Sequence, residues 1–122
     1  MDDQQEFRAE NIQPEHRKFK RVSKNYIISY APVKGEDLKF DVSQTKNLSE
    51  GGILFMSDRQ FEKDTVLKIK LRLPEFLDYV IIRAQVIESK KLAKGIIYET
   101  RARFTEVEQV VREAIRKLVD YG

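Results

Sequence analysis

Apolar and polar residues alternate along most of the chain between residues 26 and 104, and this period of two is the strongest constraint on its fold. Successive side chains of a β-strand point to opposite faces, so alternation is typical of strands with one buried and one solvated face. Residues 67–73 show it most clearly, because leucine and isoleucine alternate there with lysine and arginine. Residues 80–86 and 96–104 repeat the pattern and predict two further strands.

Turn-forming residues divide this alternating region into about six candidate strands. Pro32, Gly51-Gly52, Pro74 and Lys94-Gly95 are the main interruptions. The candidate strands are residues 26–30, 39–49, 53–56, 67–73, 80–86 and 96–104. Short strands at such spacing predict a closed antiparallel β-barrel or a sandwich.

The period changes after residue 104 to that of a helix. One helical face would carry Val107, Val110, Val111, Ala114, Ile115, Leu118 and Val119. Thr105 and Glu108 have capping-box spacing, which predicts that the helix starts there. We expect its apolar stripe to pack on the barrel; a helix that binds a partner is the alternative. The fold class is therefore all-β with a C-terminal helix.

Length and charge indicate one domain with no general affinity for polyanions. The chain has 122 residues, enough for a single core. Residues 1–14 are polar and without period, so we interpret them as a flexible leader before a domain at residues 15–122. The net charge is only +3, which does not favour DNA binding.

Several classes of function are disfavoured. There are no cysteines and one histidine, which removes cysteine zinc sites and multi-histidine metal sites. No nucleophile elbow or Gly-rich Walker loop occurs, so we expect no enzyme, no metal and no cofactor. The acidic start does not resemble a secretory signal, and no apolar run approaches the roughly 20 residues of a membrane helix. We therefore expect a cytoplasmic protein without membrane insertion.

Two short motifs remain as candidates for ligand binding. The first is a basic segment with Arg17 and Arg21 four residues apart, and the second is Asn47-Leu48-Ser49-Glu50-Gly51-Gly52. A guanidinium can bind O6 and N7 of guanine, contact phosphate or stack on a purine. Asn47 and Ser49 would share a strand face, and Gly52 would allow a sharp turn. Together the motifs favour a guanine nucleotide as ligand.

The spacing of two arginines is weak evidence by itself. Arg112 and Arg116 have the same spacing within the predicted helix, where it simply places both on one face. We interpret that pair as solvated and expect no ligand there.

With both motifs present in this order, the chain resembles the PilZ domain family. The hallmarks of that family are an Arg-x-x-x-Arg arm and an Asp/Asn-x-Ser-x-x-Gly turn. The segments "NLSEGGILF", "RAQVIES" and "YETRARF", followed by a closing helix, extend the resemblance over about residues 15–121.

The resemblance implies a six-stranded antiparallel barrel that binds cyclic di-GMP on its outer surface. Arg17 and Arg21 would hold guanines and phosphates, Asn47 and Ser49 would contact a guanine and its phosphate, and Gly52 would permit the turn. Secondary contacts would come from His16, Lys18, Lys20 and Gly51. His16 stands where many members carry arginine, which leaves one or two bound ligands open.

We therefore predict a cyclic di-GMP receptor that signals in trans to an unidentified protein partner. Two alternatives stay open: a nucleotide-independent protein adaptor, and a small barrel that binds oligonucleotides through Lys18, Phe19 and Lys20.

Overall fold

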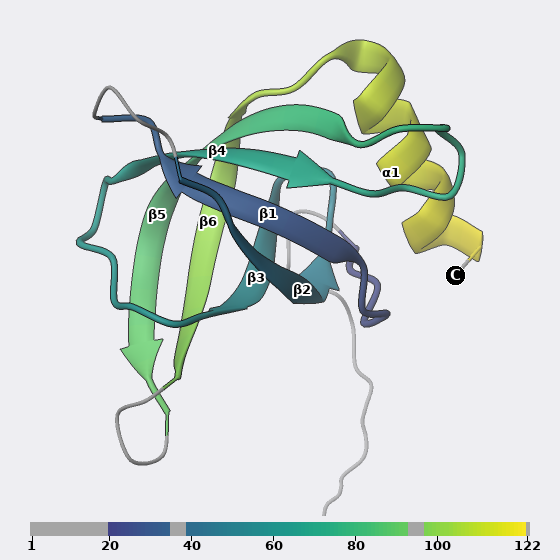
Figure 1. Cartoon of the computed structure of the whole chain (residues 1–122). Coiled ribbons are helices and arrows are strands. Elements are labelled where there is room, and N and C mark those ends of the chain that lie inside the picture. The colour runs from purple at the N-terminus through teal and green to yellow at the C-terminus, as the bar shows by residue number, and fades with distance from the viewer. Residues whose placement is uncertain (1–19, 35–38, 93–96, 122) are drawn as a thin grey trace, which may run out of the picture.

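The structure, a computed structural model, describes residues 20–34, 39–92 and 97–121. Within these ranges the chain forms six strands and one helix (Figure 1). The elements are β1 (Ile27–Pro32), β2 (Asp41–Leu48), β3 (Gly52–Ser57), β4 (Val66–Leu71), β5 (Val80–Lys91), β6 (Tyr98–Glu106) and α1 (Gln109–Tyr121).

The strands close into an antiparallel barrel in the order β1-β2-β3-β6-β5-β4, and β4 pairs back with β1. Closure leaves no long unpaired edge, which suits a sheet built from such short strands. Figure 1 shows α1, in yellow, beside the loop between β4 and β5 at one end of the barrel. The predicted six-stranded barrel with a C-terminal helix is confirmed.

The period of two in the sequence becomes the inside and outside of the barrel. Leu67, Ile69 and Leu71 of β4 are fully buried, while Lys68 and Lys70 between them reach the outer surface. At the centre of the core the rings of Tyr30 and Phe55 lie 4.9 Å apart. Burial raises the pKa of Tyr30 to about 12, because the charged phenolate would lose its hydration.

The predicted start of the helix at Thr105 is wrong. Strand β6 continues to Glu106, which pairs with Arg83 of β5, so the chain is still in the sheet one residue after Thr105 and the helix cannot start there. Instead the carbonyl of Glu108 accepts from the amides of Val111 and Arg112, at 3.0 and 2.9 Å. The helix therefore begins at Gln109, because pairing within the barrel outweighs the local capping signal.

Most of the predicted apolar stripe of α1 packs on the barrel. Val111, Ala114 and Ile115 are buried in the same cluster as the strand residues, and Leu118 lies against it. Val110 departs from the prediction, since 55% of it is exposed. Among the described residues no helix is both long and apolar enough to cross a lipid bilayer.

Candidate ligand-binding site

The turn between β2 and β3 is built by Ser49. Its hydroxyl oxygen accepts from the amides of Gly51 and Gly52, both at 3.2 Å, and its own amide donates to the carbonyl of Gly52 at 3.0 Å. A serine that bonds to the backbone ahead of it stabilises a tight turn. The hydroxyl and two amides thus converge on one small region of the surface.

Gly52 is required at its position by a close approach of two strands. A Cβ added there would lie 2.4 Å from the carbonyl oxygen of Ala102 in β6. The obstacle is backbone in a paired strand, so it cannot move aside as a flexible side chain would. The glycine therefore fixes how closely the turn sits against β6.

The segment before β1 is held to the end of β2. Val22 and Leu48 exchange two backbone hydrogen bonds, of 2.9 and 3.0 Å. The Thr45 hydroxyl adds to this attachment, because it donates to the carbonyl of Lys24 and accepts from the amide of Tyr26. As a result the residue before Val22, which is Arg21, lies beside the turn.

Strand pairing brings two further arginines to the same place. Gly52 pairs with Arg103, and Leu54 pairs with Arg101, in the register of β3 with β6. Both arginines are on the outer face of the barrel, because Thr100, Ala102 and Phe104 alternate with them toward the core.

These elements enclose a hollow of about 160 Å³, which we call the basic hollow. Its polar and glycine lining consists of Arg21, Asn47, Ser49, Gly51, Gly52, Arg101 and Arg103. Leu54 and Ile87 contribute apolar surface. The hollow thus gathers five of the residues expected in the site: Arg21, Asn47, Ser49, Gly51 and Gly52.

The positive charge that β6 brings to the basic hollow, through Arg101 and Arg103, is only partly balanced. No aspartate or glutamate of the described residues lines it. Arg103 donates to the neutral amide oxygen of Gln85, and Arg101 approaches Glu88 only to 4.0 Å, across an exposed pair. Exposed pairs at such a distance neutralise little, so the hollow favours an anion.

Other expected residues lie elsewhere or outside the described ranges. Lys20 is exposed and faces Asp120 of α1 at 4.0 Å, away from the hollow's lining. His16, Arg17 and Lys18, like the proposed leader, lie outside the described residues.

Arg101 and Arg103 were not among the residues predicted for the site. Their signal was present, because the two arginines occupy alternate outward positions of the last strand. Alternation alone marks an outward face, however, and only the pairing of β6 with β3 shows which neighbour that face has.

The geometry of the hollow suits a polar anionic ligand with flat apolar parts. Guanidinium groups bind phosphate oxygens or purine edges and also stack on bases. Asn47 and Ser49 offer amide and hydroxyl groups; the Asn47 side-chain oxygen already accepts from Ser23 at 2.9 Å, which fixes its orientation. Nothing in this arrangement resembles a nucleophile paired with a base.

The fold and the hollow define a class of protein: a small closed antiparallel barrel with a C-terminal helix and a basic site on its outer wall. A family model described as "PilZ domain" matches residues 15–121, nearly the whole chain. The chain therefore belongs to the PilZ domain family, as the motifs predicted. No curated protein sequence matches it.

Solved structures share this fold at low sequence identity. The chain is similar to the Bacillus subtilis inhibitor of motility MotI/DgrA, with a TM-score of 0.71 and 18% identity over 87% of this chain and 50% of that one. The PilZ domain of YcgR from Escherichia coli, solved with c-di-GMP, has a TM-score of 0.64 and 16% identity over 87% of this chain and 90% of that one. The K. pneumonia MrkH–c-di-GMP complex has a TM-score of 0.67 and 18% identity over 85% of this chain and 51% of that one. The chain thus spans about half of two of these proteins.

Proposed function

We propose that the basic hollow binds cyclic di-GMP and that the protein is a receptor for this second messenger. The observation that carries the proposal is the convergence of Arg21, Arg101 and Arg103 with Asn47 and Ser49 in one hollow that no described carboxylate lines. Two similar structures, of YcgR and MrkH, are complexes with c-di-GMP, and they support the same ligand here.

The chemistry of the ligand matches that of the hollow. Cyclic di-GMP carries two anionic phosphodiesters and two guanines, which present acceptors to guanidinium groups and flat faces to apolar side chains. Arg101 and Arg103 would meet a phosphate or guanine edge from β6, while Asn47 and Ser49 would approach from β2 and the turn. Leu54 and Ile87 would lie under a base.

The size of the hollow adds a condition. Pockets that enclose a drug-sized ligand measure roughly 300–1,000 Å³, and the basic hollow measures about 160 Å³. A cyclic dinucleotide would therefore be only partly enclosed by the barrel. We propose that the arm with Arg17 and Arg21 covers the rest, in agreement with the Arg-x-x-x-Arg motif.

Isothermal titration of the full chain with cyclic di-GMP tests the proposal. We expect binding at micromolar ligand, and Arg21→Ala should weaken it by about 10- to 100-fold, the cost of one charge-assisted contact. A wild-type chain that releases no heat and shows no amide shifts at that concentration would exclude the receptor function. GMP at equal concentration is the control for single-base binding.

The second part of the proposal is that the receptor is not an enzyme and acts on a protein partner in trans. Oligonucleotide binding is less well supported, because no aromatic residue lines the basic hollow among the described residues. Binding of single-stranded DNA that falls steeply with salt, without binding of cyclic di-GMP, would favour that alternative. Partner binding that is unchanged in Arg17→Ala/Arg21→Ala would favour a nucleotide-independent adaptor.

A further inference from the structure

Helix α1 is joined by ionic contacts to the turn that forms one wall of the basic hollow. Glu50, the residue between Ser49 and Gly51, is the acceptor, and its side chain is only 19% exposed. The Arg116 guanidinium forks onto the Glu50 carboxylate, with Nε–Oε2 at 3.2 Å and NH2–Oε1 at 3.5 Å. The same carboxylate raises the pKa of Arg116, so the guanidinium stays charged.

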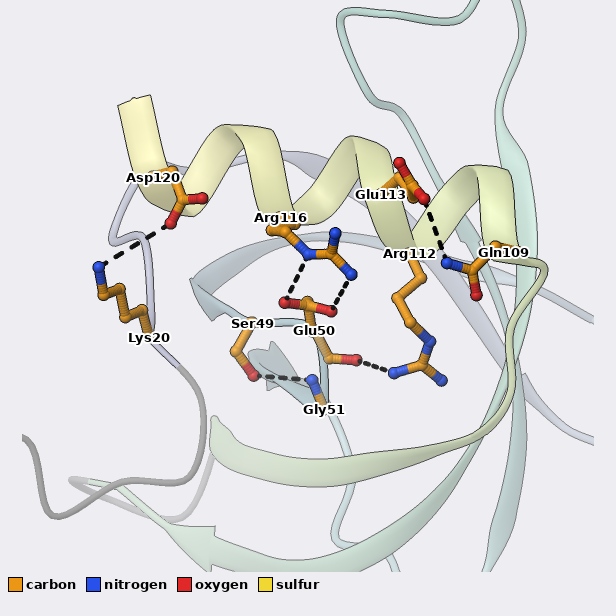
Figure 2. Close-up of polar contacts among 9 residues, drawn as sticks. All are labelled: Lys20, Ser49, Glu50, Gly51, Gln109, Arg112, Glu113, Arg116 and Asp120. Atoms are coloured by element: carbon orange, nitrogen blue, oxygen red, sulfur yellow. Dashed lines mark hydrogen bonds and ion pairs between the residues drawn. The ribbon is translucent and has the colours of Figure 1, made fainter.

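A second arginine of the helix contacts the backbone of the same residue. Arg112 donates from NH1 to the carbonyl oxygen of Glu50 at 3.3 Å. Figure 2 shows Arg112 and Arg116 pointing from one side of α1 toward the turn. The helix thus contacts Glu50 through both its side chain and its main chain. The pair that looked merely solvated in the sequence has a specific common acceptor.

The helix also faces the arm segment that carries Arg21. Asp120 lies 4.0 Å from the ammonium group of Lys20, the residue before Arg21 (Figure 2). Because both groups are exposed, their ion pair contributes little to stability. The contact nevertheless places the end of α1 next to the arm. One helix therefore reaches both motifs of the proposed site.

We propose that Arg112 and Arg116 are positioning residues for the binding turn and thereby set the affinity of the basic hollow for its ligand. This inference rests on the proposed function. Glu50 is directly bonded to Ser49 and Gly51, whose hydroxyl and amide make the turn. Holding Glu50 at both its carboxylate and its carbonyl would restrict the turn to the conformation in which Ser49 faces the hollow.

The fork also removes an electrostatic obstacle. Glu50 is the one carboxylate of the Asn47–Gly52 motif, and a free carboxylate beside the hollow would repel an anionic ligand. Paired with Arg116, it is neutralised and held toward α1. Because coupling between sites is reciprocal, a bound ligand that stabilises the turn would also stabilise the docking of α1.

The matched test compares two neighbouring residues of α1 by calorimetric titration with cyclic di-GMP. Arg116→Ala should weaken binding about two- to fivefold, the range of a partly exposed ion pair. Lys117→Ala is the control, because Lys117 pairs with Glu75 of the β4–β5 loop at 3.9 Å and not with the turn. Equal affinity of the two variants would overturn the proposal, since packing of the apolar face alone would then position the turn.

A double replacement separates positioning from general weakening. In a Glu50→Ala background, Arg116→Ala should produce no further loss of affinity, because both its ionic partner and its hydrogen-bond acceptor are gone. An undiminished loss in that background would show that Arg116 acts through another group and would contradict the inference.

A ligand-free measurement keeps the inference distinct from the proposed function. In amide NMR spectra, Arg116→Ala should shift and expose to exchange the amides of Gly51 and Gly52, whereas Lys117→Ala should not. Unchanged glycine amides in Arg116→Ala would refute the positioning role even if wild type binds cyclic di-GMP. Shifted amides with no ligand binding in wild type would keep the positioning of the turn and exclude only the receptor function.

Discussion

The basic hollow and a second hollow on the surface of the described residues differ in charge. The basic hollow measures about 160 Å³ and the other, which we call the apolar groove, about 670 Å³. The groove lies between β5 and the start of α1 and is lined by Phe76, Tyr79, Ile81, Arg83, Glu106 and Val110, among others. Its single arginine is paired with Glu106 at 3.4 Å. Glu108 also lines the groove, which therefore has no uncompensated positive charge for an anion. Chemistry, not size, thus distinguishes the proposed binding site.

The largest effect on the basic hollow is expected from removing the close approach that shapes it. Gly52→Ala would place a Cβ 2.4 Å from the Ala102 carbonyl oxygen. Because the backbone must shift, we expect loss of measurable binding of cyclic di-GMP and a cost of about 1–3 kcal/mol in unfolding free energy. Titration and urea unfolding measure the two effects.

Ile81→Ala in the apolar groove is the matched control, since 48% of that side chain is exposed. It should leave binding of cyclic di-GMP intact. A Gly52→Ala variant that binds as wild type would show that the turn's position against β6 does not shape the site.

The basic hollow and the apolar groove both depend on the stability of the barrel. Ionisation of the buried Tyr30 is a way to test that stability. Its pKa is raised from 10.0 to about 12, so the folded state favours the neutral phenol. The raised pKa adds about 2–3 kcal/mol to the free energy of unfolding below pH 10. This stabilisation is lost as the pH rises from about 10 to about 12. Urea unfolding across this range measures it.

Tyr30→Phe should show a smaller loss of stability than wild type over the same pH interval, because its ring cannot ionise. Tyr30 donates to the carboxylate of Asp58 at 3.1 Å. Asp58 is exposed, so water can replace this hydrogen bond in Tyr30→Phe. Identical pH profiles of the two proteins would mean that Tyr30 ionises without opposing the fold.

A smaller effect compares one arginine from each hollow. Arg103→Ala should weaken binding of cyclic di-GMP about tenfold, the lower end for a charge-assisted contact, because the residue is exposed. Arg83→Ala, from the apolar groove, removes the same charge from the neighbouring strand and should change affinity little. Calorimetric titration of both variants decides the matter, and equal losses would show that total charge and not the hollow attracts the ligand.

The smallest effect concerns the apolar groove itself. Val110→Ser removes an exposed apolar group from the groove, so its unfolding free energy should stay within about 0.5 kcal/mol of wild type and its affinity should be unchanged. Denaturant unfolding and titration check both. A clear loss of cyclic di-GMP binding in this variant would move the site from the basic hollow to the groove.

Much of the fold followed from local pattern. Alternation in residues 67–73 predicted the buried face of β4, and the helical stripe predicted that Ile115 packs on the barrel. The start of the helix did not follow, because pairing of Glu106 in β6 outweighed a local cap. Nor did the exposed position of Val110, since the outline of the barrel beneath α1 decides which part of the stripe is covered.

The candidate site divides in the same way. Its two motifs stand in the sequence, and the PilZ family membership they suggested is confirmed by the family match. The contributions of Arg101 and Arg103 depend on the register of β6 against β3, which brings together residues about fifty positions apart in the chain. The contact of Arg116 with Glu50 joins residues 66 positions apart.

By itself, then, the sequence determined the strands, the helix, the absence of cysteine chemistry and the two motifs, because each depends on residue type and short-range spacing. Only the tertiary structure decided which residues of distant segments meet: Arg21 beside Ser49, Arg103 opposite Gly52, and α1 above Glu50. The physical reason is that period fixes the face on which a side chain lies, whereas strand register and helix docking, which fix its neighbours, depend on the packing of the whole core.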